Sequence, residues 1–419
     1  MILLLRWFLM LTLVVTWSET LLAKINGSVS TELRVFGNDD RSSTADTNLT
    51  VAGDIDIQLK KRSFEARFWN KGRYDLLDPN RYLFLPNENW LGYQRPTLRL
   101  RAGYQIEDWS MTEIFRPSDV FNARNWDSEI QDLEKIGEMA LSARVQALGG
   151  FISAYFMPLF FAPSYPVESV RLNPVPPELK LGGPAFANPK GGLGLHNEFA
   201  DQFAFRYSTH LGPADLAVHY INHIDRSQPI LMVVPGQQAR LLFFPVTQIG
   251  LTSAVALGAW VLKFDATARA FKKSLPNPLL QSFSPGDHTT VATGFERTMS
   301  FDSGAELTVF AEYQKVIAAS ESRSSNLSVF QNDLATGARW TRGDEAGTTV
   351  RGLMINDLSL PAGREIVAVL DFQRRFGADY KLTVGYRAFI AGTSSDTATE
   401  GLAAYDKADH AYLNVAKHF

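Results

Sequence analysis

The seven histidines are the side chains in this chain best suited to catalysis or metal binding. His219 and His223 lie four positions apart, which on a strand places them on one face but about 13 Å apart, too far for one metal ion. The absence of cysteine excludes disulfides, thiolate metal sites and a cysteine nucleophile. No Gly-x-Ser-x-Gly, P-loop or His-Glu-x-x-His pattern occurs. We therefore predict no catalytic residue, no metal site, no cofactor and no enzyme.

A second group of polar side chains recurs at every other position, with apolar side chains between them. In 260–270, Lys263, Asp265 and Arg269 occupy odd-numbered positions, whereas Leu262 and Phe264 occupy even-numbered ones. Successive side chains of a strand point to opposite faces, so such a strand has one polar and one apolar face. The same period of two recurs in 49–60, 97–106, 138–147, 202–211, 305–315 and 380–390.

Segments of about ten residues with this period are typical of a transmembrane β-barrel. Short turns alternate with long connections, which is also typical of outer-membrane barrels; the long connections are 38–47, 107–137, 158–200, 224–240, 272–288, 316–327 and 392–408. We predict an all-β, antiparallel, up-and-down barrel over residues 24–419 with long extracellular or inward-folded loops. Both ends of the chain should lie in the periplasm, so the number of strands should be even. This requirement predicts a further strand near 328–342 and gives about 18 strands, with 16 as the alternative.

One uncharged stretch, residues 241–262, could also be interpreted as a membrane helix. Pro245, Gly250 and Gly258 make it a poor spanning helix, and it divides naturally into two strands that turn near 257–258. The mean hydropathy of -0.09 also argues against a bundle of membrane helices.

Both ends of the chain carry features of an exported barrel. Residues 1–23 predict a signal peptide, with Arg6 before an apolar run and Ala23 as the cleavage residue; an uncleaved membrane anchor is the alternative. The chain ends in Phe419 after apolar residues at alternate positions, which resembles the C-terminal signature by which insertion machinery recognises outer-membrane barrels. We therefore expect a bacterial cell outer-membrane location, with membrane lipid and this machinery as partners.

The region 97–137 resembles a motif of a family of uncharacterised porin-like outer-membrane barrels, domain of unknown function 1302. The matching residues are Arg101, Gly103, Gln105, Trp109, Pro117, Asp119, Asn122 and Arg124. Tyr104, Ser110, Ala123 and Asn125 depart from the family pattern, so the match is distant. The apolar, proline-bearing stretch at 157–166 and the final strands are similar as well. The resemblance implies an outer-membrane barrel and says little about a substrate.

Two long connections are candidates to narrow the lumen. The loop 107–137 is rich in apolar and charged residues, and we expect it to fold into the lumen or cap the mouth, tied by Asp119 and Arg124. The proline-rich loop 158–200 carries Phe160, Phe161 and Tyr165, which need apolar cover and are candidates for a constriction. Structured packing on the outer face is the alternative for both loops.

The polar strand faces would line the lumen and set selectivity. Their predicted members are Arg99, Arg101, Arg144, Arg206, Lys263, Asp265, Arg269, Glu306, Glu312, Lys381 and Arg387. The same polar faces also carry Asp54, Asp56 and Glu138, so basic residues outnumber acidic ones only slightly on them, which favours anions weakly. We predict a porin-like channel for passive passage of small molecules, hydrophobic solutes included. The alternatives are a structural or assembly barrel with a plugged lumen and a hydrolase at the barrel rim. The formal net charge of -3 gives no reason to expect nucleic acid as a partner.

Overall fold

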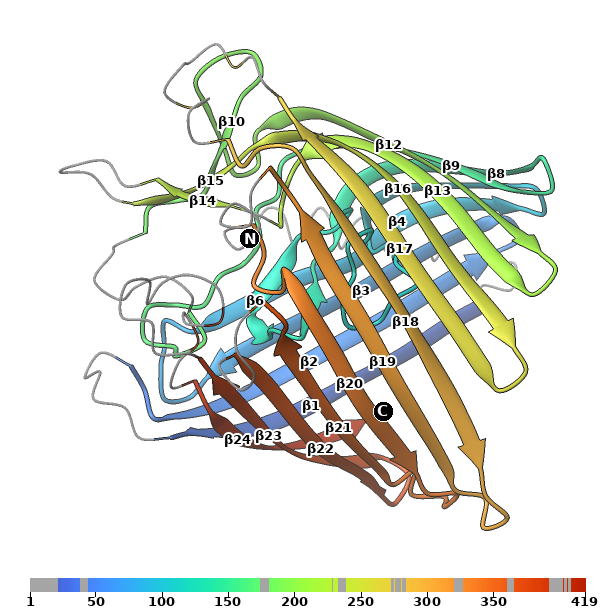
Figure 1. Cartoon of the computed structure of the whole chain (residues 1–419), viewed down its shortest axis with the longest axis vertical. Helices are drawn as coiled ribbons and strands as arrows, with labels where there is room; N and C mark the ends of the chain where they lie inside the picture. The colour runs from blue at the N-terminus through green and yellow to red at the C-terminus, as the bar shows by residue number, and fades with distance from the viewer. Residues whose placement is uncertain are drawn as a thin grey trace.

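A closed antiparallel sheet of 18 strands forms the body of the chain (Figure 1). The computed structural model describes residues 22–37, 44–173, 181–227, 229–232, 239–272, 275, 280, 284–319, 327–359, 365–391, 402, 405 and 408–419. Neighbouring strands in sequence pair throughout, and β1 pairs with β24, which closes the barrel. The predicted fold class and the count of 18 strands are therefore confirmed.

The barrel strands follow the predicted alternation segments. They are β1 (Leu22–Phe36), β2 (Thr47–Lys61), β3 (Phe64–Asp75), β4 (Tyr82–Arg95), β5 (Leu98–Gln105), β8 (Glu138–Ala147), β9 (Gly150–Leu159), β12 (Phe199–Leu211), β13 (Ala214–Ile224), β16 (Pro245–Leu257), β17 (Trp260–Phe271), β18 (His288–Ser300), β19 (Glu306–Ile317), β20 (Asn332–Thr341), β21 (Thr349–Asp357), β22 (Ile366–Phe376), β23 (Tyr380–Ile390) and β24 (His410–His418). β20 is the further strand that an even number of strands required.

The wall has an apolar outer face and a polar inner face. On β16, Ile249 and Leu251 point outward and are 60 % and 42 % exposed, whereas Gln248 and Thr252 point inward and are fully buried. This period of two is what a wall between lipid and an interior requires. The stretch 241–262 is thus mostly strand, with the predicted turn between β16 and β17. No helix formed by the described residues is long and apolar enough to cross a membrane.

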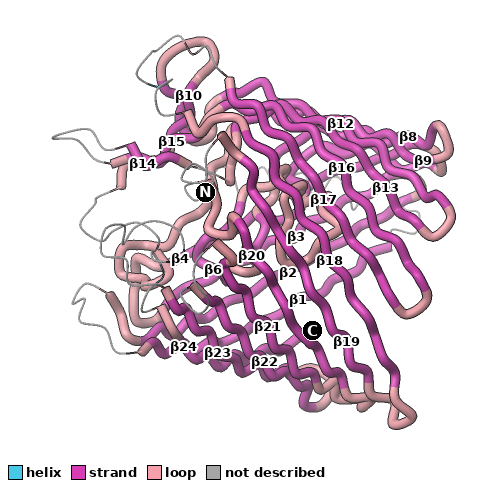
Figure 2. The backbone as a smooth tube through the Cα atoms, in the orientation of Figure 1, coloured by secondary structure: helices cyan, strands magenta, loops and turns pink. Residues whose placement is uncertain are grey.

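The two ends of the barrel differ in the length of their connections (Figure 2). At the short-turn end, eight connections of two to seven residues join strands, and both Leu22 and Phe419 lie there. At the long-loop end, the connections are mostly much longer and include the strands β10 (Ala185–Ala187), β11 (Leu193–Leu195), β14 (Ile230–Met232) and β15 (Arg240–Phe243), which form one small sheet. Residues 1–21 of the predicted signal peptide lie outside the described residues, and Leu22 and Ala23 begin β1.

The hydrophobic core lies inside the barrel, between the wall and the loops. One cluster joins Phe36, Phe115 and Phe389 with residues of the β20–β22 wall. Another joins Trp109 and Phe121 with the inner faces of β8, β9, β12 and β13. Both of these clusters contain residues of the connection between β5 and β8, so this connection is packed as part of the interior.

Candidate functional site: the lumen and its inward loop

The connection between β5 and β8, residues 106–137, enters the lumen and crosses it. We call it the inward loop. It contains the hairpin β6 (Arg124–Glu129) and β7 (Asp132–Lys135), and Figure 1 shows β6 within the ring of barrel strands. The loop bonds to strands on opposite sides of the barrel, as the following contacts show. The interpretation that it folds into the lumen agrees with the structure.

On the first side, the inward loop is held by two carboxylates of the wall. Asp265 on β17 accepts hydrogen bonds from the backbone of Met111 (3.0 Å) and the hydroxyl of Thr112 (2.9 Å). Glu312 on β19 accepts three backbone N–H groups, from residues 113–115, at 2.7 to 3.2 Å. Backbone donors aimed at a carboxylate form charge-assisted bonds, so these two acids hold the loop instead of attracting cations.

Two basic side chains of the lumen on this side also form ion pairs or hydrogen bonds. Lys263 on β17 pairs with Glu113 of the inward loop (2.5 Å) and with Glu296 of β18 (2.8 Å). Arg269 donates to Gln248 and to Ser227, at 2.8 and 2.9 Å, and pairs with Asp225 at 3.5 Å. These contacts account for most of the charge that the sequence places on this part of the lumen.

On the opposite side, Glu129 at the tip of β6 is the main contact. Its carboxylate lies 2.5 Å from Arg387 Nε on β23 and 3.3 Å from Arg34 Nη2 on β1, and it lies 4.0 Å from His410. Burial would raise the pKa of the Glu129 carboxyl, but the neighbouring His410 and the charges of Arg34 and Arg387 lower it well below its usual range. Glu129 is therefore charged under ordinary conditions and ties the hairpin to this wall.

A second buried ion network holds the same hairpin to β3. Asp127 on β6 contacts Arg73 on β3 and Arg81 in the following turn, where the Arg81 Nη2 to Asp127 Oδ1 distance is 2.9 Å. Arg81 also donates to Asp75 at 2.8 Å. The Arg81, Asp75 and Asp127 side chains are at most 5 % exposed. Removal of one partner from such a network leaves an uncompensated buried charge and is strongly destabilising.

The residues of the sequence motif build the internal frame of the inward loop. Asn122 donates to the carbonyls of Gln105 (2.8 Å) and Ile136 (2.9 Å) and accepts from the backbone of Glu107 (2.9 Å), so it joins the two ends of the loop. Asp119 pairs with Arg124 (2.5 Å) and Lys135 (2.7 Å).

The other motif residues complete this frame. The pKa of Asp119, which burial alone would raise, is lowered by the charges of Arg124 and Lys135. Trp109 is fully buried against Phe121 and Tyr155. Pro117 lies in the turn in which the backbone of Asp119 donates to Arg116. The motif therefore has a structural role that its residues alone did not reveal.

The aromatic residues of the next loop pack on one another. Phe160 is fully buried and contacts Phe186 and Phe243. Tyr165 stacks on Trp126 of the inward loop at 5.7 Å between ring centroids. Phe161 contacts the rings of Tyr104 and His196. These contacts supply the apolar cover that the sequence requires, and they place the three constriction candidates in packed loop interiors.

A cavity of about 220 Å³ remains between the inward loop and the β17–β19 wall. Its lining combines Phe115, Arg116 and Asp132 of the inward loop with Arg269 of β17 and Phe330 of the β19–β20 connection. The cavity is both aromatic and charged, and it lies beside the tethers at Asp265 and Glu312. A small solute could occupy this space at the level of the loop.

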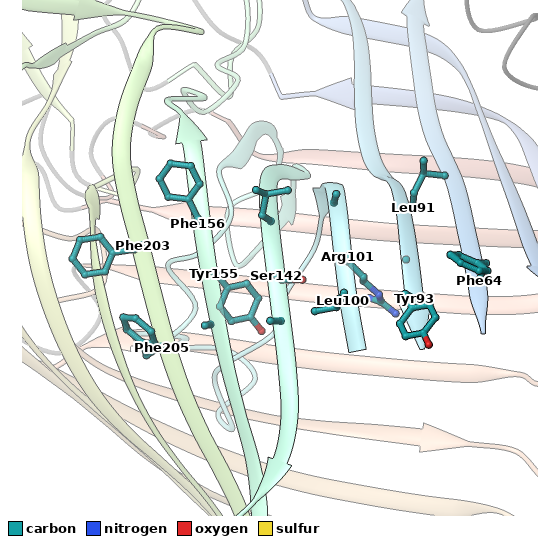
Figure 3. A pocket seen from close by; sticks show the side chains of 15 residues that line it. Phe64, Leu91, Tyr93, Leu100, Arg101, Ser142, Tyr155, Phe156, Phe203 and Phe205 are labelled. Atoms are coloured by element: carbon teal, nitrogen blue, oxygen red, sulfur yellow. The ribbon is translucent and has the colours of Figure 1, made fainter. Parts of the chain in front are cut away.

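A larger groove of about 800 Å³ lies on the wall of β3–β5, β8, β9 and β12 (Figure 3). Outward side chains such as Phe64, Leu91 and Phe205 line it, and they are at least half exposed. Arg101 and Tyr155 also border it, although the strand alternation turns them to the inner face. Because its exposed surface is apolar, this groove belongs to the lipid-facing side.

The other predicted lumenal residues differ in their surroundings. Arg387 is almost fully buried and also pairs with Asp371 at 2.6 Å. Glu306 and Lys381 lie near the short-turn end and form no ion pair with a described residue. The arginines of β5, β8 and β12 are described below. Sequence reasoning missed Arg34, Arg73, Arg81 and His410 as partners of the inward loop, although alternation along 64–75 would have put Arg73 on the polar face.

The histidines do not form a metal site within the described chain, where no group of three or more potential ligands comes together. His219 contacts Gln248 at 3.0 Å and the ring of Trp109, whereas His223 lies beside Arg226. Both residues are packed in the polar interior.

Comparison with known proteins gives distant structural likenesses. No family model and no curated protein matches the chain. Outer-membrane OmpT of Vibrio cholerae superposes with a TM-score of 0.45 at 10 % identity, over 96 % of this chain and 99 % of that one. A mutant of Rh. blastica porin gives a TM-score of 0.43 at 11 % identity, over 95 % of this chain and 100 % of that one. These scores are low, so the architecture rests on the strand pairing described above.

Proposed function

We propose that the chain is an outer-membrane channel for passive passage of small polar solutes, restricted by the inward loop. The observation that carries this proposal is a closed barrel whose outer surface is apolar and whose inner wall carries many polar and charged side chains. A wall of this kind suits a membrane with water inside it. By the same reasoning, the short-turn end faces the periplasm and the long-loop end faces outward.

The solute is proposed to be polar because the aromatic residues of 158–166 do not offer a free apolar surface. Phe160 is fully buried and Tyr165 stacks on Trp126. The cavity beside the inward loop is bordered by Arg116, Asp132 and Arg269. A hydrophobic solute would have to pass these charges without a matching partner, at a cost in desolvation.

A plugged barrel without flux is the second candidate, and the tethers of the inward loop to both walls favour it. The purified full chain in planar lipid bilayers tests the two. Stepwise conductance increments in potassium chloride are expected from the channel, whereas inserted barrels that give no conductance would establish the plugged alternative. Recovery of the chain from membranes, with a gel mobility that changes on heating, shows that the barrel is folded.

A further inference from the structure

Four arginines of the lumen wall have no acidic partner, in contrast to the tethering arginines above. They are Arg99 and Arg101 on β5, Arg144 on β8 and Arg206 on β12, and we call them the arginine cluster. All four point inward by the strand alternation and are half-buried. Within the described chain, no carboxylate lies within ion-pair distance of any of them.

The strand register brings three of them into one row. Arg99 lies directly opposite Arg144, Arg144 opposite Ser153 of β9, and Ser153 opposite Arg206. Directly opposed residues on one face have Cβ atoms about 4.5–5.5 Å apart. Arg101 lies two positions along β5 from Arg99, on the same face, and opposite Ser142. The cluster therefore covers a continuous patch of the inner wall with guanidinium groups and two serine hydroxyls.

The guanidinium groups of the cluster still have donors to offer. The Nε atoms of Arg101, Arg144 and Arg206 are buried and have no hydrogen-bond partner among the described residues. The planes of two of them stack on aromatic rings, at 3.9 Å from the Trp90 ring for Arg101 and 4.1 Å from the Phe151 ring for Arg144. Stacking fixes the planes, and because the Nε atoms are buried, the terminal Nη groups are the donors that an oxyanion could reach.

Stability alone does not explain this arrangement. Like charges directly opposite each other destabilise a sheet, and Arg99 and Arg144 are so placed. The nearest acid of the inward loop is Glu107, whose pKa is raised by burial in spite of the charges of Arg99 and Arg101. Glu65 and Asp108 also act on Arg101 and Arg206, but they pair with Lys60 and Lys135. The acids nearby therefore do not offset four cations. The excess positive charge can therefore attract anions that enter the lumen.

We propose that the arginine cluster is a lumenal binding site for small oxyanions, the carboxylate or phosphate groups of solutes. This inference deepens the proposed channel function and rests on it, because solutes reach the cluster through the lumen. The cluster lies in the half of β5, β8 and β12 toward the short-turn end, below the inward loop. An anion that has passed the loop would therefore meet it next.

The test uses the purified full chain in detergent and in planar bilayers. Inorganic phosphate binding is followed by ³¹P relaxation, with acetate as competitor, and ion preference by the reversal potential in a potassium chloride gradient. The test variant carries Arg144→Gln and Arg206→Gln. The control carries Arg339→Gln and Arg375→Gln, which remove the same charge from inward positions of β20 and β22, across the barrel, without breaking an ion pair of the described chain.

The expected result is that the unmodified chain and the control bind phosphate and prefer chloride. The test variant should bind phosphate at least about tenfold more weakly and lose most of its chloride preference. Equal binding by the test variant, or no binding by the unmodified chain, would overturn the site.

The two proposals fail separately. A barrel that binds phosphate through the cluster but conducts no ions refutes the channel and supports the site. A barrel that conducts but prefers cations and binds no phosphate refutes the site and leaves the channel. If acetate competes with phosphate, the site recognises oxyanions in general; if it does not, phosphate is the ligand that the cluster selects.

Discussion

The substitution Glu129→Gln should loosen the inward loop from one side of the lumen. The Glu129 carboxylate is the shared partner of Arg387 and Arg34, and it lies beside His410. A glutamine keeps the size of the side chain but removes the charge. Two guanidinium groups would then lose a common counter-charge, although Arg387 would keep Asp371 and Arg34 would keep Glu32 at 3.1 Å.

The size of the effect can be bounded from the burial of the pair. Removal of one partner from a buried ion pair costs about 3–5 kcal/mol. The Glu129 side chain is 24 % exposed, so the low end applies. A loss of about 3 kcal/mol corresponds to a rise of roughly a hundredfold in the population with the hairpin detached from this wall. The bonds to Asp265 and Glu312 remain, so we expect brief openings and not permanent release.

Single-channel recording measures this change as the frequency of high-conductance events. Glu306→Gln is the matched control, because it removes one acid from the lumen wall at a residue without an ion pair in the described chain. An event frequency in the Glu129→Gln variant equal to that of the control would refute the role of Glu129. The pKa of Glu129 is lowered, so the docked state is favoured above the usual carboxyl range and is lost only as the pH falls through the lowered value. The difference in event frequency between Glu129→Gln and Glu306→Gln should therefore be as large at about pH 4.5 as at pH 7.

Three further changes test other parts of the barrel. Asn122→Ala leaves the polar partners at both ends of the inward loop unsatisfied, at about 1–3 kcal/mol for each buried group, and should increase proteolysis of the loop in the folded barrel. Gly27→Val should lower the yield of heat-modifiable barrel, since a Cβ there would meet the Phe419 ring at 2.6 Å at the closing seam; normal yield would contradict that contact. Burial raises the pKa of Glu107, so it becomes neutral as the pH falls from 7 through a value above the usual carboxyl range. Chloride preference should then increase, and Glu107→Gln should show the increased value at pH 7.

Most of the fold was predicted from the alternation of polar and apolar residues along the sequence. This alternation assigned the eleven predicted lumen residues to the polar face of their strands, since alternating side chains point to two opposite faces. Parity also required a strand near 328–342, which is β20. The roles of Phe419 in insertion and of residues 1–23 in export stay predictions, because the fold does not test them.

The partners of the inward loop could not be predicted from the same pattern. Glu129 and Arg387 are 258 positions apart, and nothing in either segment indicates the other. The row of Arg99, Arg144 and Arg206 depends on the register of β5 with β8 and of β9 with β12, across long connections. Alternation gave a slight excess of basic residues on the polar strand faces, although the whole chain has a net charge of -3, and pairing in the structure showed which of these basic residues form no ion pair.

The two groups of charges should act independently, since they occupy different parts of the lumen. The tethers of Glu129 lie on β1 and β23, and the arginine cluster lies on β5, β8 and β12. Charges separated by more than about 8–10 Å of water are largely screened at physiological salt. Glu129→Gln should therefore change the frequency of openings but leave the chloride preference unchanged.

The pair Arg144→Gln and Arg206→Gln should do the reverse, and the combined variant should show both effects at their separate sizes. Openings that depend on the arginine cluster, or an ion preference that depends on Glu129, would mean that the inward loop moves onto the cluster. In that case Glu107, which belongs to the loop and faces Arg99 and Arg101, would couple the two.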